Sequence, residues 1–539
     1  MLPYHRLKNG SAALHERRHL FSDPRFLVVA LACALLVMFI AMGSRDAAAP
    51  TRLTATTWNV AAINNNPFEY WLTIPGDQAY ADLMSKVEAL MKNPGAKNIL
   101  VSEVFSEDMA RRLFKEMRAL KWEGVDAVEE LWRVDWAKRR VVSQFLRDAD
   151  IGRKRLVSMP DRITNTMAAG RSAVYRPTTV NCYGETLTSL QDWYARWLKF
   201  MFHTPVGAAG KTPAEQLGRI ERAKYPALTP EEERISIPLQ TLVLCLFDAI
   251  QVRMLNTLVG VEPWQQLRAR ICGALNLRKV QGIVDIVKRR FADSDVVFVQ
   301  EAGAALIDEA ARQLAFHVVA PAARSKSDQN SLVLLNRAVF QTDNVQDVTA
   351  EVMALLKDQK GVAAGDLLAV VATDLWNRRF LLCSFHGDTN GLQTVPVATA
   401  VQQWASAQPS LRLLFGLDAN AYAQGEPGET LDVLDFAAAY VRLGLNSCWG
   451  KKPDPRVHTT RNARTYMQPQ LSKAASQSEI DAKGDCNPKD FVLFWDSQFA
   501  PEAAQRDNTG EGRYDDAVVF PTLSFPSDHA ALTAVVREL

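Results

Sequence analysis

Pro526-Ser527-Asp528-His529 decides the fold, because it closes a series of six short polar motifs that each accompany an apolar run of the chain. The five motifs before it are, in chain order, Thr57-Trp58-Asn59, Val299-Gln300-Glu301, Ser384-Phe385-His386, Gly416-Leu417-Asp418-Ala419-Asn420 and Lys489-Asp490-Phe491-Val492. Several follow runs with the composition of buried strands, at residues 53–58, 295–299, 380–385 and 411–415. A buried polar group without a partner costs about 2–7 kcal/mol, so these side chains need partners. A metal ion and a phosphate group would supply them.

The order of the motifs is more specific than any one of them. An Asn after a strand is commonly a turn residue, and Asp-x-Asn is commonly a loop. In this order, however, the motifs resemble the endonuclease/exonuclease/phosphatase (deoxyribonuclease I-like) superfamily over residues 51–75 and 291–539. The resemblance implies an α/β catalytic domain, a four-layer α/β sandwich in which two packed mixed β-sheets are flanked by helices. The alternation of short apolar strands with helices after residue 296 agrees with that architecture.

Residues 76–290 indicate a mostly α-helical insertion into this catalytic domain. Thr229-Pro230-Glu231-Glu232, for example, has the capping Thr, the first-turn Pro and the acidic residues of a helix start. A strand predicted at 98–104 carries Glu103 near its end, which makes Glu103 a rival to Glu301 as the metal carboxylate. Glu301 is preferred because Gln300 precedes it and an apolar strand at 332–335 follows it, as in the superfamily.

The uncharged run from Phe26 to Gly43 predicts one N-terminal transmembrane helix at 26–43, since it is near the length that crosses a bilayer core. Basic residues are more numerous before this run than after it. The positive-inside rule therefore places residues 1–25 in the cytosol as a tail, and the catalytic domain in a lumen or outside the cell. A cleaved signal peptide is the alternative, because small residues between Asp46 and Pro50 would suit cleavage. A buried core helix is a second alternative.

Charge and cysteine content narrow the choice of partners. The 62 basic and 60 acidic residues give a formal net charge of +2, whereas proteins that grip long nucleic acids usually carry a basic surplus. The charge balance and the anchor together favour a lipid-like or small phosphodiester substrate over nucleic acid. The cysteines after the apolar run show no CxxC spacing, so no structural zinc site is indicated. Cys448 and Cys486 flank a loop-rich stretch and could pair in an oxidising compartment.

The resemblance assigns the metal and water-activating roles to five residues. Asn59, Glu301 and Asp528 would hold the metal, and their hard oxygen donors suit Mg2+, with Mn2+ as the alternative. Asp418 would orient or deprotonate the attacking water, and Asn420 would lie beside the phosphate.

Two imidazoles complete the implied site. His529 would contact the phosphate while Asp490 fixes its tautomer, and His386 would donate to the phosphate or to the leaving group. Three basic residues are candidate substrate contacts, although they could also form a solvated basic face: Arg461, Arg464 and Lys489.

Two departures from the superfamily bear on the substrate. Lys489-Asp490-Phe491-Val492 stands where inositol 5-phosphatases carry Trp-Cys-Asp-Arg, and Ala61 stands where abasic-site endonucleases carry an acidic residue. The sequence therefore predicts a membrane-anchored, Mg2+-dependent phosphoric ester hydrolase, either a phosphodiesterase or a phosphatase. The alternatives are a nuclease acting on DNA or RNA and a catalytically inactive, membrane-tethered binding protein on the same fold.

Overall fold

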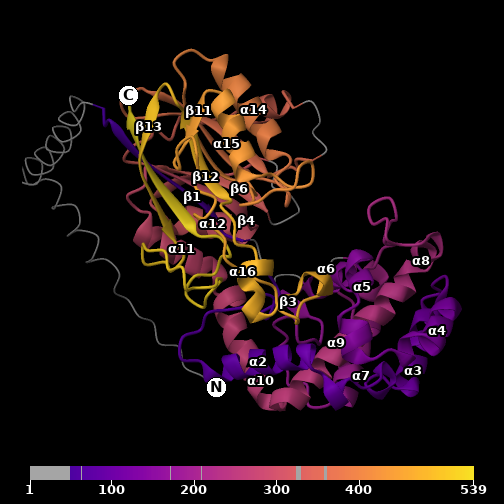
Figure 1. The fold of residues 1–539 in the computed structure, drawn as a ribbon. Helices are drawn as coiled ribbons and strands as arrows, with labels where there is room; N and C mark the ends of the chain where they lie inside the picture. Colours follow the sequence, from indigo (N-terminus) through magenta and orange to yellow (C-terminus); the bar gives the residue numbers. More distant parts are fainter. Residues whose placement is uncertain (1–48, 62–63, 170–171, 208, 323–328, 357–360) are drawn as a thin grey trace, which may run out of the picture. The chain divides into compact units, whose positions relative to one another are not determined.

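The first of two six-stranded β-sheets has the strand order β13-β14-β1-β4-β6-β5 in the computed structural model (Figure 1). Strands β1 and β4 run parallel and the other neighbours run antiparallel, so the sheet is mixed. Strand β4 is buried on both faces, which is why its sequence is an apolar run without alternation. The strands are β1 (Arg52–Asn59), β4 (Val296–Ala302), β5 (Phe316–Val319), β6 (Asn330–Asn336), β13 (Phe499–Asp507) and β14 (Ala531–Glu538).

The structure describes residues 49–61, 64–169, 172–207, 209–322, 329–356 and 361–539. From Arg52 to Leu539 these residues belong to one compact unit. The predicted cytosolic tail at 1–25 and the predicted transmembrane helix at 26–43 lie outside the described residues, so both stay predictions.

The second sheet has the strand order β11-β12-β10-β9-β8-β7 and is also mixed, because β9 and β10 run parallel within it. Its register aligns the polar ends of three strands: Asp418 lies opposite His386 on one side and opposite Asp490 on the other. The strands are β7 (Gln346–Asp347), β8 (Leu367–Thr373), β9 (Arg379–His386), β10 (Arg412–Asp418), β11 (Leu445–Ser447) and β12 (Asp490–Trp495).

Three apolar cores separate four layers of secondary structure. The core between the two sheets includes Phe298 and Val492, and Gly416 allows the sheets to approach, because a Cβ there would lie 2.3 Å from the Phe298 ring. Helices α11 (Lys279–Arg290) and α12 (Ala304–Gln313) cover the first sheet. Helices α13 (Thr349–Met353), α14 (Thr394–Ser406) and α15 (Val433–Arg442) cover the second. The mixed α/β architecture predicted from the sequence is therefore confirmed.

The chain between β1 and α11 is mostly helical and shares one large apolar core, with a small hairpin formed by β2 (Thr166–Ala169) and β3 (Ser172–Tyr175). This core also takes in side chains between Ala463 and Ile480, the first residue of helix α16 (Ile480–Lys483). Helix α11, by contrast, packs on the first sheet. The helices are α2 (Gln78–Lys92), α3 (Glu107–Ala119), α4 (Val125–Val134), α5 (Ala149–Arg153), α6 (Ser158–Thr164), α7 (Leu190–His203), α8 (Pro230–Arg234), α9 (Ser236–Val259) and α10 (Val261–Cys272).

Within the described residues, α9 is the only helix long and apolar enough to cross a membrane. Its most apolar window is 72% buried inside the protein, and its side chains belong to the core of the helical part. A helix that is apolar on all sides and covered by other helices is a typical central core helix. We therefore interpret α9 as the structural centre of the helical part.

The strand predicted at 98–104 is wrong, because residues Val101–Glu103 form a 3-10 turn inside the helical part. The Glu103 carboxylate accepts a hydrogen bond from the Leu100 amide at 2.8 Å and so caps this turn. The apolar side chains that suggested a strand are used in helix packing, since Val101 and Val104 belong to the same core as α9. Glu103 is thus a local capping residue.

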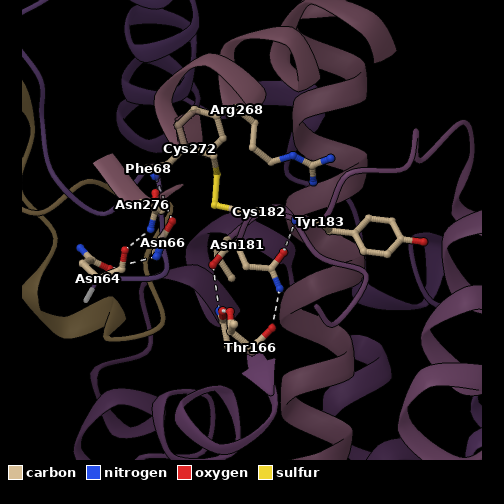
Figure 2. The surroundings of a disulfide bond; sticks show 12 residues. Asn64, Asn66, Phe68, Thr166, Asn181, Cys182, Tyr183, Arg268, Cys272 and Asn276 are labelled. Atoms are coloured by element: carbon tan, nitrogen blue, oxygen red, sulfur yellow. Dashed lines mark hydrogen bonds between the residues drawn. A yellow bond between two sulfur atoms is a disulfide. The ribbon is translucent and has the colours of Figure 1, made fainter. Parts of the chain in front are cut away.

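A disulfide links Cys182, in the loop after β3, to Cys272 at the end of α10, with a Cα–Cα distance of 5.7 Å (Figure 2). The suggested pairing of Cys448 with Cys486 is wrong, because both are free thiols. Cys448 is buried in the sandwich, where its sulfur accepts a hydrogen bond from the Val492 amide. The disulfide therefore joins two segments of the helical part that are 90 residues apart in the sequence.

Candidate functional site

The polar motifs converge at one edge of the two packed sheets. Strands β9 and β10 end at His386 and Asp418, and the antiparallel strand β12 begins at Asp490, so all three residues lie on the same edge. In the first sheet, Asn59 at the end of β1 is in register with Gln300 of β4. The carboxyl ends of parallel strands commonly form such sites.

Asn59 joins the two sheets through its side chain. Its Nδ2 donates to Glu301 Oε1 at 3.0 Å and to Asp418 Oδ2 at 2.9 Å, and its Oδ1 accepts from the Ala61 amide at 2.8 Å. The main-chain oxygen of Asn59 accepts from Ser527 Oγ at 2.6 Å. Asn59 therefore fixes one carboxylate from each sheet relative to the Pro526–His529 segment.

Three residues around the site have positive φ without being glycine. They are Ala61 at 51°, Glu301 at 54° and Asn420 at 47°. The β4–β6 pairing is also irregular between Val299 and Ala302, and a bulge of this kind redirects a side chain out of the regular ladder. Unfavourable backbone conformations concentrate at functional sites, so their clustering supports a site at this edge.

His529 and Asp490 form a buried carboxylate–imidazole pair. His529 Nδ1 lies 3.0 Å from Asp490 Oδ2, and His529 Nε2 lies 3.6 Å from Asp418 Oδ2. Burial opposes a charge on the imidazole, but Asp490 and Asp418 outweigh burial and raise the pKa of His529 to about 10. With Nδ1 held by Asp490, Nε2 is the nitrogen turned towards Asp418.

His386 approaches the same carboxylates from the neighbouring strand. Its Nε2 lies 3.2 Å from Glu301 Oε1 and 3.6 Å from Asp418 Oδ2. Burial raises the pKa of Glu301, but His386 and the hydrogen bond from Asn59 lower it by more than burial raises it. The net shift of the pKa is therefore downward. Asp418 behaves in the same way: burial raises its pKa, and His529 and His386 bring it below the ordinary value. Both groups are therefore carboxylates at neutral pH.

Two sets of residues could hold a metal ion. Ligand atoms of Asp418, Asp490 and His529 lie within 4.8 Å of one another, but Asp490 already pairs with His529 Nδ1, which makes this set a hydrogen-bonded pair beside a carboxylate. Glu301 and Asp528 line the same cavity and offer only carboxylate oxygens. Hard oxygen donors are the ligands that Mg2+ takes in proteins. The donor chemistry at Glu301 and Asp528 thus fits a hard divalent cation.

A cavity of about 460 Å³ opens over this edge. Eight of the residues predicted from the sequence line it: Glu301, His386, Asp418, Asn420, Arg464, Lys489, Asp528 and His529. Asn59 and Asp490 lie fully buried beneath the cavity and reach its lining through hydrogen bonds. Arg461 does not line the cavity, because its guanidinium pairs with Asp481 at 2.6 Å instead. The roles of these residues stay predictions.

Lys489 is placed to contact an anion in the cavity. Its ammonium donates to Asn420 Oδ1 at 3.1 Å and to Asp485 Oδ2 at 2.7 Å. Burial opposes its charge, but Asp485 and Asp418 outweigh burial and raise the pKa of Lys489. In turn, burial raises the pKa of Asp485, while Lys489 lowers it, to a net value of about 2. Lys489 thus fixes the Asn420 carboxamide oxygen, while Asn420 Nδ2 donates to the Gly387 carbonyl at 2.9 Å.

Sequence reasoning missed two residues that line the cavity from the helical side. Lys279, at the start of α11, donates to the Ala61 carbonyl, and burial lowers the pKa of its ammonium to about 8 despite the nearby Asp528 and Glu301. Tyr70 accepts a hydrogen bond from Arg464 at 3.2 Å, and burial followed by Asp528 raises the pKa of its hydroxyl. Neither residue stands in one of the six motifs, although Tyr70 lies in the stretch 64–71 that follows the first of them.

Comparison with known proteins adds a family for the helical part. Residues 98–269 match a family described as "Domain of unknown function (DUF8234)". This match covers less than half of the chain and falls within the predicted insertion. No curated protein matches the chain.

The similar solved structures include three proteins that match about half of this chain. TDP2 of D. rerio, complexed with a single strand DNA product, is 12% identical, covering 48% of this chain and 91% of that chain with a TM-score of 0.31. An endonuclease/exonuclease/phosphatase family protein of Bacteroides thetaiotaomicron is 12% identical, covering 50% and 91%, with a TM-score of 0.33. The human Nocturnin catalytic domain with a bound sulfate anion is 12% identical, covering 50% and 89%, with a TM-score of 0.31.

Proposed function

We propose that this protein is a divalent-metal-dependent phosphoric ester hydrolase that uses an activated water. One observation carries the proposal: Asn59 holds the carboxylates of Glu301 and Asp418 together at the floor of a cavity that two imidazoles and a lysine also line. Hydrolysis of a phosphate ester needs a cation, a positioned water and donors for the charge that develops in the transition state. The cavity offers residues of each kind.

The metal would be held by Glu301 and Asp528, with Asn59 beside them, and Mg2+ is the ion that best suits these donors, with Mn2+ as the alternative. When bound, such an ion neutralises phosphate charge and polarises the phosphorus–oxygen bond. The protein's own contribution is to fix the two acids. The positive φ of Glu301 and the Asn59 hydrogen bond do so for Glu301, and the Asn59–Ser527 bond does so for the segment that carries Asp528.

Asp418 is the proposed base that orients or deprotonates the water. Its Oδ1 accepts from the Asn420 amide at 2.9 Å and its Oδ2 accepts from Asn59, which fixes the carboxylate plane. Because its pKa is lowered by the two imidazoles, Asp418 is ionised at neutral pH and can accept a proton. His529 is the proposed phosphate donor, since Asp490 keeps its Nδ1 occupied and leaves Nε2 for a phosphate oxygen.

His386 and Lys489 are the further cationic or donor groups at the proposed phosphate site. His386 reaches the same two carboxylates from β9, so it could donate to the phosphate or to the leaving oxygen. Lys489 donates to Asn420 Oδ1, and both residues line the cavity, so the ammonium is a further donor for a phosphate oxygen. Arg464 lies farther towards the helical side, where it could contact the rest of the substrate.

For location, we propose a single-pass membrane protein with a cytosolic N-terminus and a lumenal or extracellular catalytic domain. The apolar run at 26–43 motivates this proposal. The Cys182–Cys272 disulfide supports it, since disulfides persist mainly in oxidising compartments. A cleaved signal peptide would deliver the same domain to the same side of the membrane.

For the substrate, we favour a lipid-like or small phosphodiester over DNA or RNA. The near balance of basic and acidic residues supports this choice. A nuclease remains the second candidate for the same site. A catalytically inactive binding protein would be the third, but it would have no need for the ordered set of acids and imidazoles around Asn59.

The test is hydrolysis of bis(4-nitrophenyl) phosphate by the full chain in detergent, with excess Mg2+ or with EDTA. Turnover that requires Mg2+ and is lost in Glu301→Gln and in His529→Ala would support the proposal. Sphingomyelin, inositol phosphates and DNA would then be compared as substrates. Turnover that survives both substitutions would refute the assigned site.

A further inference from the structure

A second cavity of about 290 Å³ adjoins the proposed catalytic cavity. Four residues line both: Asn64, Asn66, Glu69 and Arg464. The loop Asn64–Asn66 is held from the helical side, because Asn276, four residues after Cys272, donates to the Asn64 carbonyl (Figure 2). The two cavities therefore share a wall that the sandwich and the helical part build together.

The far wall of the second cavity comes from the helical part. Arg155 follows α5, Ser158 and Arg162 belong to α6, and Tyr225 lies in the loop before α8. The Arg155 guanidinium lies 5.6 Å from the centre of the Tyr225 ring. In the orientation of the Gln470 carboxamide that satisfies both its oxygen and its nitrogen, the oxygen accepts hydrogen bonds from the Arg155 guanidinium. Residues of the family of unknown function thus supply this wall.

The charges around this cavity do not cancel. Its two acidic lining residues are paired, Glu69 with Arg464 and Asp161 with Arg176 at 2.6 Å, and Arg176 also pairs with the buried Asp248. Arg155 and Arg162 form no ion pair with any carboxylate in the part of the chain that the structure describes. Lys473 lies near these arginines. Burial is the main cause that lowers the pKa of its ammonium, and Arg464 and Arg155 lower it further. The cavity is therefore a concentration of positive charge.

Two further features indicate a binding site. Arg155 has φ of 60°, an unfavourable conformation for a residue with a side chain, and it places a guanidinium at the cavity wall. Among the residues that the structure describes, the Ser158 hydroxyl oxygen is buried and has no hydrogen-bond partner, whereas buried polar atoms in proteins normally have one. A ligand with acceptor oxygens would give the Ser158 hydroxyl a partner and would add to the bonds that Arg155 makes with Gln470.

We propose that this second cavity binds a phosphate group that is not hydrolysed, carried by the same substrate whose ester is cleaved in the adjoining cavity. The guanidinium fork of arginine matches phosphate oxygens in pairs, and Arg155 and Arg162 are the proposed contacts. The substrate class is accordingly a small molecule with two phosphate groups, and the helical part selects it. Calling this ligand a substrate rests on the proposed function. Binding of a ligand with two phosphate groups, however, does not depend on turnover.

The test measures binding with ligands that cannot be hydrolysed. The full chain in detergent and Mg2+ is titrated by calorimetry with α,ω-alkane bisphosphonates of increasing length, each compared with the alkylphosphonate of the same length. Losing charge-assisted hydrogen bonds costs about tenfold in affinity or more. We therefore expect one chain length to bind at least about tenfold more tightly than its monophosphonate, and Arg155→Gln/Arg162→Gln to abolish that advantage.

The matched control is Arg111→Gln/Arg133→Gln, which removes two exposed arginines that pair with acids on α3 and α4 and do not line the cavity. It should bind every ligand as the unaltered chain does. If the Arg155/Arg162 variant does not fold, the exposed Arg162→Gln alone should reduce the advantage severalfold.

Three outcomes would overturn the inference: no length preferred over its monophosphonate, a preference that survives in the Arg155/Arg162 variant, or tighter binding of a 5′-phosphorylated dithymidine phosphorothioate than of the best bisphosphonate. The last result would assign the cavity to the next phosphate of a nucleic acid. A chain that binds bisphosphonates through these arginines but hydrolyses no ester would uphold the cavity and refute only the catalytic proposal.

Discussion

Replacing Gln300 with Met should weaken both the sandwich and the site, because Gln300 joins the two sheets directly beneath the cavity. Its side chain is fully buried, and its Nε2 donates to Thr57 Oγ1 of the first sheet and to Ser384 Oγ of the second, each at 3.1 Å. Methionine has a similar volume, so the substitution leaves little empty space. The main loss is therefore of hydrogen bonds.

The magnitude follows from those two bonds. Each contributes about 1 kcal/mol net, and leaving buried hydroxyls unsatisfied adds to the cost, so Gln300→Met should lower the free energy of unfolding by about 2–4 kcal/mol. Gln300 also precedes Glu301, whose positive φ places its carboxylate in the cavity. Loss of the anchor should let Glu301 move, which would raise the Mg2+ concentration needed for half-maximal turnover.

Guanidinium unfolding and Mg2+-dependent turnover measure the two effects. The matched control is Leu332→Met on β6, a buried apolar position in the same sheet, where a change of similar volume should cost less than about 1.5 kcal/mol. The reasoning would be refuted if Gln300→Met were no less stable than Leu332→Met and responded to Mg2+ like the unaltered chain.

Further predictions concern other parts of the chain. Lys279→Met should reduce turnover at least about tenfold if its buried ammonium contacts substrate, while Lys288→Met, an exposed lysine on the same helix, should leave turnover unchanged; equal rates in both would exclude Lys279 from the site. Cys182→Ser/Cys272→Ser should lower the free energy of unfolding by about 4 kcal/mol, as expected for a bridge across 90 residues, and an unaltered unfolding midpoint would contradict this. The pKa of Asp485, about 2 in the folded protein against 3.8 ordinarily, means that its pairing with Lys489 stabilises the fold above pH 3.8 and is lost as the pH falls towards 2. Lys489→Met should therefore move acid unfolding, followed by circular dichroism, to higher pH, and an unchanged midpoint would argue against the ion pair.

Much of the site could be predicted because its residues stand at the ends of recognisable strands. His386, Asp418 and Asp490 are brought into one row by the register of β9, β10 and β12, and their apolar runs are visible in the sequence. The two-sheet architecture was predicted from the superfamily resemblance, and the alternation of apolar runs with helices agrees with it.

Other features depend on tertiary packing, which leaves no local pattern. The residues near Glu103 have the composition of a strand, but their apolar side chains pack among helices instead. Lys279 reaches the cavity only because α11 returns to cover the first sheet. Arg461 could not be separated from Arg464 by sequence, since both pair with an acid and only the tertiary packing places Arg464 at the cavity. Disulfide connectivity cannot be deduced from cysteine spacing alone, and Cys182 and Cys272 meet through the folding of the helical part.

Calorimetric titration of the full chain with Mg2+ tests the central claim most directly, with Glu301→Gln and Glu103→Gln as a matched pair. Both substitutions remove one carboxylate charge, but only Glu301 lies at the cavity floor beside Asn59, whereas Glu103 caps a turn in the helical part. The account predicts Mg2+ binding that is lost in Glu301→Gln and kept in Glu103→Gln. Mg2+ binding that is absent from the unaltered chain, or that survives in Glu301→Gln, would contradict it.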